Sequence, residues 1–193
     1  MSLAYYLQQI QVHLIQTHGQ TLSWFEETTT IKNYRPKDNG WTVLEILEHI
    51  ALTSHFLMIL IDKSAKKALQ NSNNLPLEEL KEAFDYDLST IDQIGIHHSF
   101  EWIRPTHMEP KGDKSELQIK AELITHLTRC LTHLDTLKNG EGLLHTTTMS
   151  VNELGRLNVY EYIYFLSKHA ERHLAQMQEN KSECTAHPSP TSL

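Results

Sequence analysis

Apolar residues recur at intervals of three and four along most of the chain, which is the spacing of one face of an α-helix. This pattern predicts four long helices, over residues 3–28, 42–69, 115–139 and 158–178. The second of them is apolar over most of its circumference, which indicates a central position in the core. No stretch shows a convincing strand pattern, internal repeat or domain boundary.

Polar residues at the expected helix starts support these boundaries. Two pairs have the spacing of a capping box: Thr42 with Glu45, and Ser115 with Gln118. Asn158 is a suitable N-cap for the last helix. Pro76 is expected to begin a shorter helix that continues to Ile91. Residues 95–113 form a loop long enough to be a lid or the wall of a site.

These elements predict an all-α fold, a four-helix bundle with an extra short helix and long crossover loops. A length of 193 residues suits one domain. We assign residues 1–178 to that domain. Residues 179–193 are rich in Ser, Pro and Thr without periodicity, and we expect them to form a mobile C-terminal tail.

Charge and composition narrow the functional classes. The formal net charge is -7 and no basic run is present, which argues against binding to nucleic acid or to an anionic membrane. The longest apolar stretch, residues 50–61, is too short to span a bilayer. Two cysteines are too few for a disulfide framework, and no signal peptide is evident, so we expect a cytoplasmic protein.

Histidine is the residue type that suggests chemistry. Thirteen histidines would give about 0.8 pairs at spacing i,i+4 by chance, and one such pair, His169 and His173, is present. Both continue the apolar stripe of the last helix, so the two imidazoles are expected to face inward and could hold one metal ion. The segment reads H-A-E-R-H rather than H-E-x-x-H, and Glu171 is expected to point away, which argues against a zinc protease.

A third ligand must come from another helix, and His49 is the best candidate because it lies in the most apolar helix. A histidine there needs a hydrogen bond or a metal ion. The residues alone leave open that all three are ordinary core or rim histidines. Glu45, one turn before His49, either orients the ring of His49 or serves only in the capping box, and we favour the capping box.

The remaining histidines are expected to be structural or solvent-exposed. His13 could face the core, whereas His126 and His133 share a helix face that we expect to be mostly solvated. Four more lie in predicted loops, where they could line the mouth of a pocket: His97, His98, His107 and His145.

Two segments resemble the DinB/YfiT-like superfamily. G-W-T-V-L-E-I-L-E-H-I (residues 40–50) is similar to the tryptophan-to-histidine signature at the start of that superfamily's second helix. The segment from Gly155 to Met177, with its H-x-x-x-H and the trailing Gln176, is similar to the last helix. The resemblance covers about residues 1–178, and these two segments are its specific part.

The resemblance implies an up-down-down-up four-helix bundle with one divalent metal ion, such as nickel or zinc, on His49, His169 and His173. It implies a metal-dependent enzyme for a small-molecule substrate, either an S-transferase that uses a low-molecular-weight thiol or a hydrolase. It also implies a homodimer. The alternative is a non-catalytic metal-binding or interaction module of a stress response. The catalytic residues and the thiol are not indicated by any segment.

Overall fold

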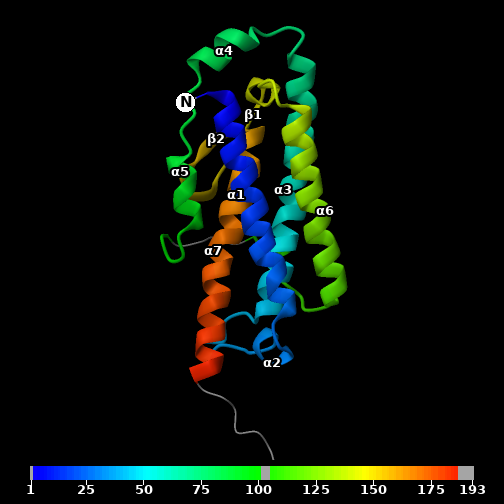
Figure 1. The fold of residues 1–193 in the computed structure, drawn as a ribbon, viewed down its shortest axis with the longest axis vertical. Helices are drawn as coiled ribbons and strands as arrows, with labels where there is room; N and C mark the ends of the chain where they lie inside the picture. Colours follow the sequence, from blue (N-terminus) through cyan, green and yellow to red (C-terminus); the bar gives the residue numbers. More distant parts are fainter. Residues whose placement is uncertain (1, 101–104, 187–193) are drawn as a thin grey trace, which may run out of the picture.

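The computed structural model describes residues 2–100 and 105–186, and most of them are helical. Four long helices dominate: α1 (Leu3–Ser23), α3 (Val43–Asn71), α6 (Glu116–Thr136) and α7 (Val159–Ala186). In Figure 1, α1 and α7 run from top to bottom, and α3 and α6 run in the opposite direction. Helices α6 and α7 each pack against both α1 and α3. The predicted all-α class is confirmed, with one small sheet added.

Capping interactions fix where α3 and α6 begin. Oγ1 of Thr42 accepts the backbone N–H of Glu45 at 3.2 Å, and Oε2 of Glu45 accepts the backbone N–H of Thr42 at 2.8 Å. Ser115 and Gln118 form the same reciprocal pair at the start of α6. Both predicted capping boxes are confirmed, and the first of them sets the position of His49 two turns into α3.

The first helix ends earlier than the predicted Thr28. After Ser23 the chain forms a 3₁₀ turn, η1 (Trp24–Glu26), and then the short helix α2 (Thr29–Lys32), whose N-cap is Thr28. Trp24 and Phe25 are buried in an apolar cluster that also contains residues of α3, α6 and α7, so the turn adds both aromatic side chains to this part of the core. Helical periodicity did not reveal the break because both sides of it are apolar.

The predicted single helix from Pro76 to Ile91 is instead two short helices, α4 (Leu77–Ala83) and α5 (Ser89–Asp92). A 3₁₀ turn, η2 (Gln93–Gly95), follows α5. The helix is interrupted at Phe84, where the backbone becomes extended. There the rings of Phe84 and Tyr86 pack edge-on against Tyr6, at centroid distances of 6.0 and 5.3 Å. Aromatic packing thus overrides local helix propensity.

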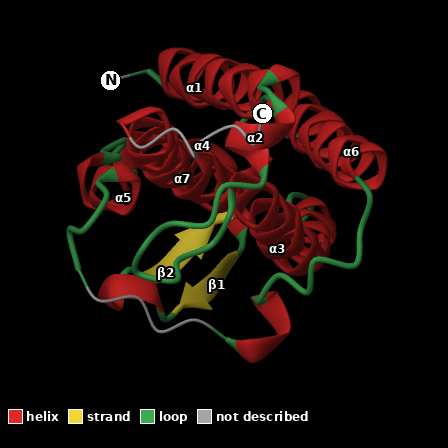
Figure 2. Ribbon diagram, turned by 90° about the horizontal axis from the view of Figure 1, so that it is seen from below, coloured by secondary structure: helices red, strands yellow, loops and turns green. Residues whose placement is uncertain are grey.

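A two-stranded antiparallel sheet, which the sequence pattern did not predict, precedes α7. Strand β1 (Thr146–Met149) pairs with β2 (Gly155–Asn158), and Thr146 lies opposite Asn158. Two 3₁₀ turns, η4 (Glu141–Leu144) and η5 (Val151–Glu153), flank β1. Figure 2 shows the hairpin beside α3 and α7, on the side away from α1 and α6. Strands of four residues are too short for a recognisable alternation.

Helix α7 continues past the predicted end at Gln178 to Ala186. Nδ2 of Asn180 donates to the carbonyl of Trp41 at 2.7 Å. Oε1 of Glu183 accepts from the hydroxyl of Tyr34 at 3.0 Å and from the backbone N–H of Lys37 at 3.1 Å. Polar contacts rather than an apolar stripe fix these turns, which is why periodicity ended early. Residues 187–193 of the predicted tail lie outside the described residues.

By length and composition alone, helix α3 could cross a membrane. No other helix within residues 2–100 and 105–186 meets these two criteria. Most of its apolar stretch is buried inside the protein. A core helix passes the same test. Helix α3 packs against α6, α7 and η4, which agrees with the central position predicted from its apolar circumference.

Candidate metal centre

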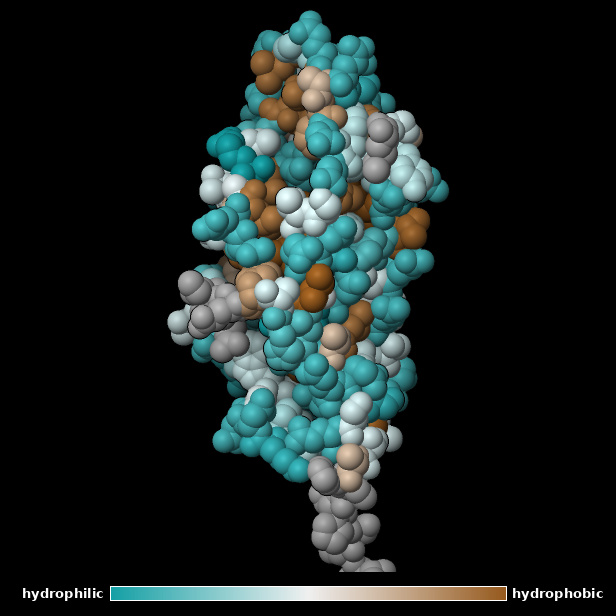
Figure 3. Space-filling view, turned by 90° about the vertical axis from the view of Figure 1, so that its left-hand side faces the viewer, coloured by the Kyte–Doolittle hydropathy of each residue, from teal (hydrophilic) through white to brown (hydrophobic). Residues whose placement is uncertain are grey.

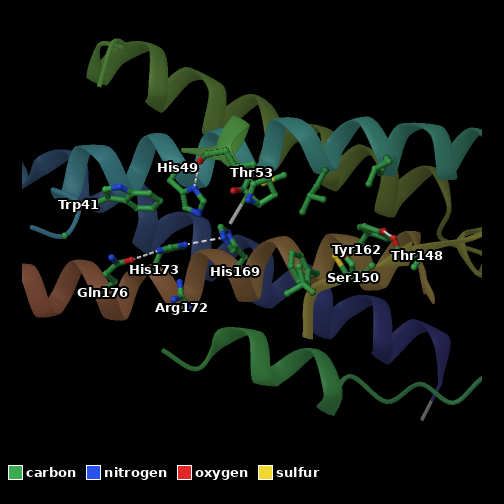
Figure 4. Close-up of a pocket in the computed structure, with 18 of the residues that line it drawn as sticks. Trp41, His49, Thr53, Thr148, Ser150, Tyr162, His169, Arg172, His173 and Gln176 are labelled. Atoms are coloured by element: carbon green, nitrogen blue, oxygen red, sulfur yellow. Dashed lines mark hydrogen bonds between the residues drawn. The ribbon is translucent and has the colours of Figure 1, made fainter. Parts of the chain in front are cut away.

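The structure brings together the three histidines that the sequence singled out. His49 extends from α3 toward His169 and His173 on α7 (Figure 4). The Nε2 atoms of His169 and His173 are 3.2 Å apart, and one ring nitrogen from each histidine lies within 4.8 Å of the other two. All three residues are buried, with at most 5% of their surface exposed.

Hydrogen bonds orient two of the rings. Nδ1 of His49 lies 2.7 Å from the carbonyl oxygen of Met108, in the 3₁₀ turn η3 (Thr106–Met108). A carbonyl only accepts, so Nδ1 carries the proton and Nε2 presents its lone pair. Nδ1 of His173 donates in the same way to Oε1 of Gln176 at 2.8 Å. Such bonds to the second ring nitrogen are typical of metal-ligating histidines.

The site favours neutral imidazoles. Burial lowers the pKa of His169 and His173 well below the ordinary value, and the neighbouring histidines and Arg172 lower it further. Metal ligation requires the unprotonated ring nitrogen. The environment therefore keeps both rings in the form that binds a metal ion.

The donor set fits a divalent transition-metal ion. Zinc–nitrogen bonds of about 2.0–2.1 Å in a tetrahedron imply nitrogen–nitrogen edges of roughly 3.3 Å, and the His169–His173 edge is 3.2 Å. Imidazole suits zinc, nickel and related ions. Among residues 2–100 and 105–186, no Cys, Asp or Glu joins this group of three. The three histidines could therefore hold a metal ion and leave a coordination position open.

A cavity of about 470 Å³ adjoins the three histidines. Its apolar wall includes Leu57, Leu60 and Phe165, and its polar groups include Thr53, Thr148, Ser150 and Tyr162. Oγ1 of Thr53, one turn after His49, is buried and has no hydrogen-bond partner among the described residues. A buried hydroxyl beside a cavity is a group that a bound ligand can satisfy.

The long loop predicted as a site wall does form one, since Pro105 and Met108 line the cavity. Glu48, which is 2% exposed, fastens this loop to α3. Its two carboxylate oxygens accept the backbone N–H groups of Lys111 and Gly112 at 3.2 and 2.9 Å. We did not identify Glu48 from the sequence, although a glutamate within the most apolar helix, next to His49, was a usable signal.

Glu45 serves the capping box, as we favoured from the sequence. It caps Thr42 and also accepts from Nη2 of Arg35 at 2.6 Å, so both of its oxygens are engaged away from His49. Glu171 likewise lies outside the cavity lining and pairs with Lys168 at 2.5 Å.

Two other histidines lie apart from the site. His13 contacts Oγ of Ser167 at 2.9 Å and Oε2 of Glu171 at 3.1 Å. His126 is 4% exposed, which corrects the prediction of a mostly solvated face on α6. The flanking Lys120 and Arg129 suggested solvent, but His126 itself lies toward α3, with its ring 6.3 Å from that of His55.

The fold and the site together define a helical protein with an inward-facing group of three histidines that could hold one metal ion beside a cavity. The model of the DinB superfamily matches residues 13–177, and the chain belongs to this superfamily. It is similar to the uncharacterized protein YuaE of Bacillus subtilis (strain 168), with 25% identity over 153 residues, or 78% of this chain and 83% of that protein. No solved structure gives a significant match.

Proposed function

We propose that this protein is a divalent-metal-dependent enzyme for a small-molecule substrate, either a thiol-dependent S-transferase or a hydrolase. His49, His169 and His173 would hold the metal ion. The observation that carries the proposal is that these three residues line one cavity of about 470 Å³. A purely structural metal site is usually closed by four protein ligands and needs no such space.

We also infer an up-down-down-up four-helix bundle formed by α1, α3, α6 and α7. The opposite directions of α1 and α7 relative to α3 and α6 support it (Figure 1). We further propose that the protein binds neither nucleic acid nor a membrane surface, and the net charge of -7 supports this proposal. A cytoplasmic homodimer is also part of the proposal and rests on the family resemblance.

The roles of the residues follow from their contacts. A divalent ion on three neutral imidazoles supplies Lewis acidity and lowers the pKa of a bound water or thiol. Met108 and Gln176 hold the rings of His49 and His173 in the ligating orientation. Thr53 offers the substrate a hydroxyl that has no hydrogen-bond partner in the described part of the chain. The apolar wall excludes bulk water and strengthens polar interactions inside the cavity.

The metal content of the purified protein, measured by elemental analysis, tests the site. Full-length protein purified without a histidine tag should contain close to one divalent metal ion per chain, and the same measurement identifies the metal. His169→Ala should lose most of it, because one of three ligands is removed. His55→Ala, which replaces an exposed histidine outside the group, is the matched control and should keep the metal. Equal metal content in wild type and His169→Ala would overturn the assignment.

A substrate screen tests the reaction class. Metal-loaded protein is assayed with low-molecular-weight thiols plus electrophiles, and separately with activated esters and amides. Conjugation would identify an S-transferase, and hydrolysis without thiol would identify a hydrolase. Either activity should disappear in His169→Ala. Metal binding without turnover in either arm would favour the alternative, a non-catalytic metal-binding module.

A further inference from the structure

A second group of ligating side chains lies outside the cavity, where the segment after η2 passes α7. His97, His98 and Glu179 each place one donor atom within 4.8 Å of the others. Oε2 of Glu179 is 3.2 Å from Nε2 of His97 and 3.8 Å from Nε2 of His98. We propose that these three side chains form a second, solvent-accessible site for a divalent transition-metal ion such as Zn²⁺.

The backbone at His98 brings the two imidazoles to one side. Consecutive side chains in an extended segment point in opposite directions. His98, however, has φ of 63°, in the left-handed region that non-glycine residues adopt at a cost of about 1 kcal/mol. The result is a close pair of rings with centroids 3.7 Å apart and planes inclined by 35°. Both rings then share the carboxylate of Glu179.

The donor atoms of the group suit metal ligation. His97 and His98 each offer a ring nitrogen, and Glu179 offers a carboxylate oxygen. Two imidazoles and one carboxylate are a donor set that zinc and similar ions accept.

Exposure indicates how this site differs from the first. The side chain of His97 is 11% exposed, whereas those of His98 and Glu179 are 76% and 59% exposed. The exposure of His98 and Glu179 lets water complete the coordination. Figure 3 shows this side of the molecule, where hydrophilic residues surround smaller apolar patches. Because of this exposure and the nearby positive charge of Arg172, the second site should bind more weakly than the buried one.

The two sites are separate. Glu179 follows His173 by six residues, which corresponds to about 9 Å along the axis of α7. One ion cannot contact both groups at that separation. A metal ion at the second site would fasten the segment after η2 to α7, since two ligands come from that segment and one from the helix.

Calorimetric titration of untagged, full-length protein with Zn²⁺ tests the proposal. Wild type should bind one Zn²⁺ at this site in addition to the ion of the buried site. Glu179→Gln and His98→Asn should each weaken it at least tenfold, because each removes one of three ligands. Asparagine tolerates the left-handed backbone of residue 98. His55→Asn, at an exposed histidine outside the group, is the matched control and should bind like wild type.

Hydrogen exchange of the amides of residues 93–100 provides a second readout. Zn²⁺ should slow their exchange in wild type and in His55→Asn, but not in Glu179→Gln. His169→Ala should lose the buried metal and keep the second binding event, which separates this proposal from the proposed function. A Glu179→Gln protein with wild-type Zn²⁺ stoichiometry, affinity and protection would overturn the second site.

Discussion

Glu48→Ala should weaken metal binding although Glu48 lies outside the proposed ligand set. The carboxylate of Glu48 accepts two backbone N–H groups, from Lys111 and Gly112. The loop that it fastens carries the Met108 carbonyl, which orients His49 through a 2.7 Å hydrogen bond. Removing Glu48 should therefore loosen the loop and free the His49 ring to rotate.

The magnitude follows from these contacts. Hydrogen bonds to charged groups contribute about 1.5–3 kcal/mol each. Lys111 and Gly112 are exposed, so water will satisfy their freed N–H groups. The net loss in the free energy of unfolding should therefore be about 1–3 kcal/mol rather than the full sum. Loss of the bond that orients a metal-ligating histidine typically weakens metal affinity by about tenfold or more.

Two measurements separate the effects. Urea unfolding in the presence of a chelator gives the loss of stability, and competition with a chromophoric chelator gives the metal affinity. Met108→Ala keeps the backbone carbonyl that His49 needs and serves as the control, with affinity close to wild type. If Glu48→Ala unfolds more easily but binds metal as tightly as wild type, the loop does not position His49 and the reasoning fails.

Three further predictions concern other buried residues, two of them polar. Burial lowers the pKa of His126 to about 4, against about 6.5 in the unfolded chain, with smaller contributions from Arg129 and His55. The folded protein therefore loses stability as pH falls from 6.5 to 4, because the unfolded chain binds the proton more readily. His126→Leu should reduce this loss in the free energy of unfolding by about 1–2 kcal/mol. Urea unfolding of chelator-treated protein at several pH values measures the difference. Thr53→Val should raise the free energy of unfolding by about 1 kcal/mol, because the buried hydroxyl that it removes has no hydrogen-bond partner among the described residues. The metal content, measured by elemental analysis, should stay unchanged. Gly142→Ala should lower the melting temperature, since an added Cβ would lie 2.5 Å from the ring of Tyr160; an unchanged value would show that the ring moves aside at no cost.

Sequence patterns identified the four long helices because their apolar stripes span many turns, and the capping pairs located the starts of α3 and α6 within a residue. Breaks that depend on tertiary contacts were missed. The interruption at Phe84 follows from packing against Tyr6, and the last turns of α7 depend on partners in residues 34–41. Periodicity carries no information about such distant partners.

The candidate site was predicted only in part, for a related reason. His49, His169 and His173 are marked by inward positions on predicted helices, so helix geometry brings them together. The groups that orient and enclose them come from irregular backbone instead: the Met108 carbonyl from a 3₁₀ turn and the Thr148–Ser150 wall from a short hairpin. A backbone carbonyl has no side-chain signature, so its role requires the three-dimensional structure.

The position of α7 after α3 in the chain affects the order in which the site can form. Two of the three clustered histidines lie on this helix, and its later residue Asn180 holds the carbonyl of Trp41, whose ring packs 4.8 Å from that of His49. During translation, His49 on α3 emerges before its two partners on α7. A metal ion can therefore find the complete triad only after the part of α7 that carries His169 and His173 has been synthesised.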